Sequence, residues 1–193
     1  MELNGFEIIL ASGSPRRQAF FKEMGLPFRV ETHNVDEDFP EELKGIAIAE
    51  YITKQKAAPF LKKIQPKQLV ITADTIVWHK NQCLGKPHDK MAAYEMLTSL
   101  SGTQHDVITA VGFLQHKQWE CQHAVTTVSF KNLNKNTIME YVESGSPMDK
   151  AGGYGIQDVI GILGIESING SYTNVVGLPV AQVLDKIQEI IAG

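Results

Sequence analysis

Short apolar runs rich in β-branched residues alternate with stretches whose apolar residues recur at helical spacing, and this alternation restricts the chain to a mixed architecture. The runs Ile8–Ala11, Phe28–Glu31 and Leu69–Ala73 predict strands. Ser14 followed by Pro15 predicts the start of a helix directly after the first strand. We therefore expect an α/β (mixed α+β) fold, with a twisted mixed β-sheet flanked by helices.

The rest of the chain continues this alternation. Gly25 predicts the end of the first helix, and Gly45 a break in the helical stretch Glu41–Lys63. The segment Gly145–Gly177 is rich in glycine, which predicts either turns or backbone that approaches a ligand closely. Further predicted elements are a strand at Ile76–Trp78, a turn at Lys80–Gln82, a helix capped by Asp89, a hairpin of Asp106–Leu114 with Trp119–Phe130, a helix at Thr137–Glu143 and a last helix opened by Pro179.

Composition narrows the class of protein. The chain has 193 residues, 43% of them hydrophobic, which predicts one domain covering 1–193. The net charge of −4 argues against nucleic-acid binding. No apolar run reaches the roughly 20 residues of a membrane span, and the N-terminus lacks the pattern of a signal peptide. Two cysteines without a paired motif fit free thiols, so we expect a cytoplasmic protein without membrane partners.

The run Leu10–Arg17, Leu-Ala-Ser-Gly-Ser-Pro-Arg-Arg, is the first candidate site. It joins a buried strand to a helix N-terminus, where backbone N–H groups and the helix dipole favour an anion. Ser12, Ser14 and two arginines add donors that suit phosphate oxygens. The alternative is a capped helix whose arginines are solvated. The run is not a P-loop, since no G-x-x-x-x-G-K-[ST] sequence is present.

Two groups of carboxylates form the next candidates. Asp74, followed by Thr75, is expected at the carboxyl end of an apolar strand, where it could bind a divalent ion or take a proton from water. The alternative is an Asx turn that ends the strand. The run Asp36–Asp38 offers three carboxylates to a hard metal ion, and the alternative there is a solvated loop.

Lysines supply point charges for phosphate, and Lys56, Lys86 and Lys150 are the candidates, each with a solvated surface lysine as its alternative. Other chemistries lack their motifs. The chain has no complete dinucleotide-binding fingerprint, no histidine spacing typical of zinc hydrolases and no G-x-S-x-G elbow.

Six blocks in order make the chain resemble the Maf family of nucleotide pyrophosphatases, and they span nearly its whole length. The blocks are Leu-Ala-Ser-Gly-Ser-Pro-Arg-Arg (10–17), Val-Asp-Glu (35–37), Ala-Asp-Thr (73–75), Leu-Gly-Lys-Pro (84–87), Asp-Lys-Ala-Gly-Gly-Tyr-Gly-Ile-Gln (149–157) and Asn-Gly-Ser-Tyr-Thr-Asn-Val-Val-Gly-Leu-Pro (169–179). The resemblance implies a Maf-like fold of two lobes with a deep cleft. It also implies metal-dependent hydrolysis of a nucleoside triphosphate between the α- and β-phosphates.

The resemblance also implies roles for single residues. Asp74 would be the proton acceptor that activates water, and Glu37 would help it hold Mg²⁺ or Mn²⁺. Lys150 is the weakest of these assignments. The remaining implied sites are Arg16, Thr75 and Gln157, which would select the base, and Ser12, Lys56 and Lys86, which would hold phosphates.

Arginine, threonine and glutamine at the positions of Arg16, Thr75 and Gln157 are similar to the branch that hydrolyses dTTP and UTP. The branch acting on 7-methyl-GTP typically has tryptophan where Arg16 stands. Two alternatives stay open beside this reading: a nucleotide-binding regulator of septum formation with little turnover, and a house-cleaning hydrolase of modified pyrimidine nucleotides. The oligomeric state stays open as well, with a homodimer as the assembly considered.

Overall fold

The computed structural model describes residues 2–116 and 118–193. In the described part of the chain, no helix is long and apolar enough to cross a membrane. The helices and strands, in chain order, are β1 (Glu7–Leu10), α1 (Pro15–Glu23), β2 (Phe28–Val30), α2 (Ile46–Ala57), η1 (Ala58–Phe60), β3 (Gln68–His79), β4 (Gln82–Leu84), α3 (Lys90–Leu100), β5 (Gln104–Gln115), β6 (Gln118–Phe130), α4 (Lys135–Glu143), η2 (Ser146–Asp149), η3 (Ala151–Gly153), α5 (Val159–Gly164), β7 (Ile165–Asn169), α6 (Tyr172–Val176) and α7 (Val180–Ala192).

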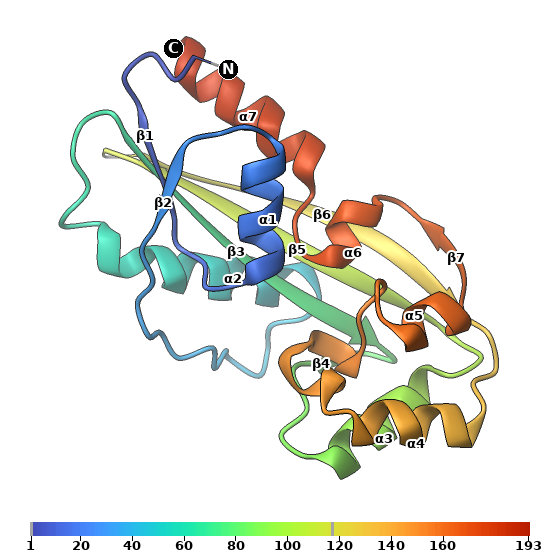
Figure 1. The fold of residues 1–193 in the computed structure, drawn as a ribbon. Coiled ribbons are helices and arrows are strands. Elements are labelled where there is room, and N and C mark those ends of the chain that lie inside the picture. The colour runs from blue at the N-terminus through green and yellow to red at the C-terminus, as the bar shows by residue number, and fades with distance from the viewer. Residues whose placement is uncertain (1, 117) are drawn as a thin grey trace. The chain divides into compact units, whose positions relative to one another are not determined.

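The seven strands of the described residues form one mixed sheet, in the order β2-β1-β3-β5-β6-β7, with β4 paired to β3 (Figure 1). The pairs β1–β2 and β1–β3 are parallel, whereas β3–β4 and β6–β7 are antiparallel. The predicted fold class, a mixed sheet flanked by helices, is confirmed. The two predicted long β stretches are neighbours in the sheet, as expected of a hairpin.

The chain divides into two compact units. The first comprises residues 1–74, 109–124 and 177–193, and the second comprises residues 75–108 and 125–176. Three strands, β3, β5 and β6, contribute residues to both units, and the division within β3 falls between Asp74 and Thr75.

The first unit buries both faces of its strands. In β1, Ile8 and Leu10 pack with Phe21 of α1 and with the apolar stripe of α7, while Ile9 belongs to a separate cluster with Ala57 and Phe60. This division follows from strand geometry, because successive side chains point to opposite faces. Accordingly, α1 and α7 cover one face of these strands and α2 the other (Figure 1).

Predicted start and stop signals explain the helix bounds in this unit. Ser14 is the N-cap residue and Pro15 begins α1, although the Ser14 side chain makes no capping hydrogen bond. Gly25 follows α1 with a φ of +65°, a conformation that glycine adopts without strain. Gly45 has a φ of +51° directly before α2, so the predicted stretch Glu41–Lys63 becomes a shorter helix that starts at Ile46.

The second unit has its own core, which α3, α4 and α5 form with the unit's portions of the sheet. Asp89 caps α3 as predicted, since its carboxylate accepts a hydrogen bond from the Ala92 backbone N–H at 2.7 Å. Lys80 and Asn81 both have positive φ and form the predicted turn, which joins β3 to β4. The glycine-rich segment is more ordered than turns alone, because it contains η2, η3, α5, β7 and α6.

Candidate active site

Asp74 lies inside β3, not at its carboxyl end, and this corrects the prediction made from the apolar run Leu69–Ala73. The β-branched residues after Asp74 continue the strand to His79, so the Asx-turn alternative is wrong as well. The parallel partner β1 does end early, because its pairing with β3 stops at Ile71. Asp74 thus extends beyond the carboxyl end of β1, from which the loop to α1 also departs.

The Lys56 ammonium joins two carboxylates. Lys56, in the last turn of α2, places Nζ 2.7 Å from Oδ1 of Asp74 and 2.8 Å from Oε1 of Glu37. The Asp74 side chain is 11% exposed and that of Lys56 18%, whereas Glu37 is half-exposed at 49%. These three residues come from separate sequence motifs, and the fold brings them together in the first unit.

The same pair of carboxylates is the group best suited to a divalent cation. In residues 2–116 and 118–193, no three His, Cys, Asp or Glu side chains gather as a metal-binding cluster. Asp74 and Glu37 nevertheless direct oxygens at one positive group, which shows that both can face a shared cation. Two carboxylates fit Mg²⁺, which commonly takes one or two of them and completes its shell with water and substrate phosphates.

Arg17 is buried, which contradicts the alternative of solvated arginines for this position and removes Arg17 from the donors expected for phosphate. Its Nε donates to the carbonyl of Gly177 at 2.8 Å, and its Nη1 donates to the carbonyl of Ala73 at 2.9 Å and to Oγ of Ser12 at 3.3 Å. Burial lowers the pKa of the Arg17 guanidinium, and the charge of Asp74 opposes this shift. Arg17 therefore fastens α1 to the strand residue beside Asp74.

The contacts of Ser12 leave its hydroxyl hydrogen available for a ligand. Its Oγ accepts from Arg17 Nη1 and from the Ser14 backbone N–H, both at 3.3 Å. Because both contacts use the oxygen as an acceptor, the hydroxyl can still donate. The first turn of α1 contains no acidic residue, so nothing there opposes the attraction of the helix dipole for an anion. Arg16, next in the helix, is partly exposed.

The other predicted residues belong to the second unit. Thr75 follows Asp74 in β3, Lys86 is exposed in the loop after β4, and Gln157 is exposed in the turn before α5. Lys150 is engaged within this unit, since its Nζ lies 2.6 Å from an Asp149 oxygen and 3.4 Å from an Asp158 oxygen. These ion pairs give Lys150 a structural role beside its weak assignment as a phosphate ligand.

Two further features complete the first unit. Asp36 accepts a hydrogen bond from the Asp38 backbone N–H at 3.2 Å, which supports the loop alternative for those two acids.

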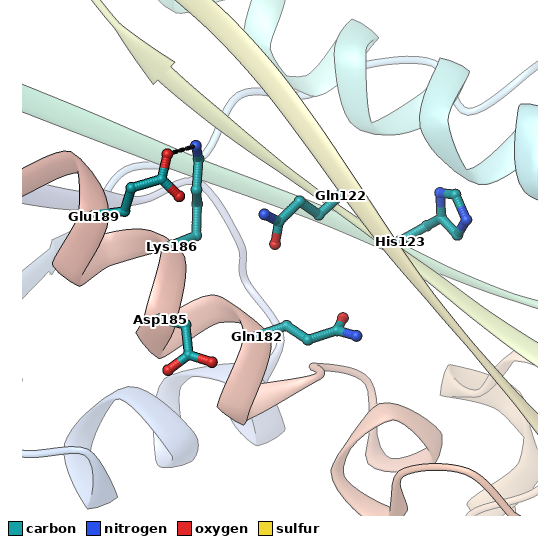
Figure 2. Close-up of a pocket in the computed structure, with 6 residues that line it drawn as sticks. All are labelled: Gln122, His123, Gln182, Asp185, Lys186 and Glu189. Carbon is teal, nitrogen blue, oxygen red and sulfur yellow. Dashed lines mark hydrogen bonds and ion pairs between the residues drawn. The ribbon is translucent and has the colours of Figure 1, made fainter.

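A separate polar groove of about 400 Å³ lies between β6 and α7 (Figure 2) and contains none of the predicted site residues. It is lined by Gln122, His123, Gln182, Asp185, Lys186 and Glu189.

Comparison with known proteins agrees with the resemblance found in the sequence. The family model described as Maf-like protein matches residues 7–190. The dTTP/UTP pyrophosphatase of Flavobacterium johnsoniae is 43% identical over 190 residues, covering 98% of each chain. A dTTP/UTP pyrophosphatase of Bacteroides fragilis is 45% identical over 189 residues, covering 97% of this chain and 98% of the relative.

Among solved structures, the Staphylococcus aureus Ham1 protein is a distant match. It is 12% identical, covers 64% of this chain and 71% of its own, and has a TM-score of 0.44. Family membership therefore rests on the sequence relatives.

Proposed function

The chain belongs to the Maf family, and on that premise we propose that it hydrolyses dTTP and UTP to the nucleoside monophosphate and pyrophosphate. The observation that carries the proposal is the convergence of Lys56, Asp74 and Glu37 in the same unit as the loop from β1 to α1. It combines a base, a phosphate-binding cation and a second carboxylate. Relatives named dTTP/UTP pyrophosphatase support the substrate.

Asp74 is the proton acceptor in this proposal. Its carboxylate is largely buried and oriented by Lys56, which suits a group that must meet one water molecule in a fixed position. The carboxylate takes a proton from that water as the oxygen attacks the α-phosphorus. The bond from the α-phosphorus to the bridging oxygen breaks, and pyrophosphate leaves with the bonding electron pair.

Three side chains, Ser12, Lys56 and Lys86, are proposed to hold phosphate oxygens. The Ser12 hydroxyl donates, because Arg17 and the backbone already occupy its oxygen as an acceptor. Lys56 offers the positive charge, which offsets the charge that develops on the leaving group. Lys86 is proposed as a second cation for the phosphates.

Asp74 and Glu37 are the residues that would hold Mg²⁺ or Mn²⁺. When bound, the ion would polarise phosphate oxygens and neutralise part of the charge of the triphosphate. The protein's own contribution is two hard oxygen donors, one nearly buried and one half-exposed, so that one carboxylate is fixed and the other can adjust to the substrate.

Selection of the base is proposed for Arg16, Thr75 and Gln157. A guanidinium, a hydroxyl and an amide supply the donors and acceptors that pyrimidine carbonyl and imide groups require. Arg16→Trp should therefore lower the rate of UTP hydrolysis while leaving the melting temperature nearly unchanged. An unchanged substrate profile would show that Arg16 does not read the base.

A direct assay separates this function from its alternatives. Purified protein with Mg²⁺ should convert dTTP and UTP to the monophosphate and pyrophosphate. Tight nucleotide binding without pyrophosphate release would favour the regulator of septum formation. Faster turnover of modified pyrimidine triphosphates than of dTTP would favour the house-cleaning hydrolase, and release of orthophosphate would contradict cleavage between the α- and β-phosphates.

Three broader expectations accompany the proposal. We propose that the protein acts in the cytoplasm, binds no nucleic acid and forms a homodimer. Cell fractionation, a gel-shift assay with DNA and RNA, and sedimentation of the full chain would test them in turn.

A further inference from the structure

A buried pair of threonines links α2 to β3 next to the candidate site. Thr53 in α2 and Thr72 in β3 are both fully buried. The Thr72 hydroxyl donates to the Thr53 carbonyl oxygen at 3.0 Å, and the Thr53 hydroxyl donates to the carbonyl of Ala110 in β5 at 3.3 Å. A hydrogen bond between a strand side chain and a helix carbonyl fixes how far the helix can slide along the strand.

The hydrogen bond between Thr72 and Thr53 joins the same faces of α2 and β3 as the ion pair between Lys56 and Asp74. Thr53 and Lys56 are three residues apart in α2 and lie on one face of the helix. Thr72 and Asp74 are two residues apart in β3 and point to the same face of the sheet. The contacts Thr72–Thr53 and Asp74–Lys56 are therefore consecutive along one helix–strand interface, and the first sets the register of the second.

The Thr72 hydroxyl has little room for another position. A Cβ atom added to Gly112 in β5 would lie 2.7 Å from Thr72 Oγ1 and 1.9 Å from the Trp119 ring. The hydroxyl and the indole thus fill the space that a side chain at residue 112 would occupy. Close packing on this side keeps the Thr72 hydroxyl directed at α2.

We propose that Thr72 is a positioning residue, whose hydroxyl holds the last turn of α2 so that the Lys56 ammonium stays against the Asp74 carboxylate. The consequence for turnover rests on the proposed function. Asp74 can activate water only while Lys56 orients its carboxylate, and small displacements at a reacting centre are costly. The positive charge of Lys56 remains in the site whatever its exact position, so attraction of the triphosphate changes little.

Two substitutions separate the hydroxyl from the shape of the side chain. Thr72→Val keeps the branched shape but removes the hydroxyl, and we expect it to lower kcat for dTTP roughly tenfold with KM within about threefold. Thr72→Ser restores the hydroxyl without the methyl group, and its kcat should return to within about threefold of the wild type. A purely structural role predicts the reverse order, with the serine variant the poorer enzyme.

A chemical readout tests the position of Lys56 without any turnover. Acetylation of single lysines, followed by mass spectrometry, should show Lys56 reacting at least about threefold faster in Thr72→Val than in the wild type, because its ammonium is no longer held against carboxylates. Surface Lys67 serves as the internal reference. Thr53→Val is the matched control, since it removes a buried hydroxyl at the same contact but leaves the carbonyl that Thr72 binds.

The outcomes are distinct. Faster labelling of Lys56 in Thr72→Val alone supports the positioning role, even if the wild type releases no pyrophosphate and the proposed function fails. Equal labelling in the wild type and Thr72→Val, or equal acceleration in Thr53→Val, would overturn it. Melting temperatures of all three variants identify any that are globally unfolded at the assay temperature.

Discussion

Nζ of Lys56 lies 2.7 Å from Oδ1 of Asp74, so the proposed base and a proposed phosphate ligand neutralise each other before substrate arrives. Glu37 contacts the same ammonium at 2.8 Å. An incoming triphosphate oxygen must therefore share the Lys56 ammonium, which has three donors, with both carboxylates. Binding must redistribute these charges, which makes the arrangement of the three side chains sensitive to single substitutions.

Asp74→Asn is expected to remove the base while preserving the shape of the side chain. Pyrophosphate release from dTTP should fall at least about 100-fold, within the range typical of a lost general base. The melting temperature should change little, because Lys56 retains Glu37 as a partner. Turnover close to that of the wild type would show that another group activates water.

Glu37→Gln is expected to weaken the response to Mg²⁺. The concentration needed for half-maximal activity should rise at least about tenfold, since even an outer partner of a metal ligand is typically worth that much. Asp36→Asn is the matched control, because Asp36 binds the backbone of Asp38 instead of Lys56. A chelator should abolish turnover in the wild type and in both variants. An equal Mg²⁺ response in Glu37→Gln and Asp36→Asn would remove Glu37 from the metal site.

Local signals predicted much of the first unit. The pair Ser14–Pro15 and the glycines at 25 and 45 mark helix ends because they act through backbone conformation, which short sequence windows contain. The residues of the site were found as separate motifs. Their convergence on Lys56 depends on the packing of α2 against β3, and no local pattern encodes that contact.

Long-range context explains the predictions that were wrong. Aspartate usually favours a turn, but strand pairing within the sheet and the apolar residues that follow Asp74 continue β3 to His79. Arg17 looked like an exposed anion ligand, although its acceptors, the carbonyls of Ala73 and Gly177, come from distant parts of the chain. In the glycine-rich segment, α5 and β7 are too short for their apolar residues to show a helical or a strand periodicity.

Arg17→Met is expected to destabilise the protein through unpaired carbonyls. Losing charge-assisted hydrogen bonds to Ala73 and Gly177 should cost about 3 kcal/mol of unfolding free energy and lower the melting temperature by roughly 6–12 °C. Arg16→Met, at the partly exposed neighbouring position, should change the melting temperature by less than about 2 °C. Similar losses in the two variants, measured by calorimetry, would contradict the different roles assigned to the two arginines.

His105 should make the stability of the second unit depend on pH. Burial, and then the nearby His79, lower the pKa of His105 from 6.5 to about 3, and its Nε2 lies 2.7 Å from the Tyr154 hydroxyl. Between these two pKa values the unfolded chain binds a proton that the folded chain does not. The contribution of His105 to the free energy of unfolding is therefore fully present above pH 6.5 and is lost as the pH drops towards 3.

The loss attributable to His105 should be about 2 kcal/mol by pH 5, as measured by urea unfolding at pH 7.5 and pH 5. His105→Gln keeps a polar side chain but cannot take up the proton, so it should unfold more easily at neutral pH yet lose less stability on acidification. His116→Gln, at an exposed position, should keep the full dependence of the wild type. The pH dependence is assigned to His105 because this buried side chain excludes a proton in the folded state. If His105→Gln loses as much stability on acidification as the wild type, other groups govern the acid response.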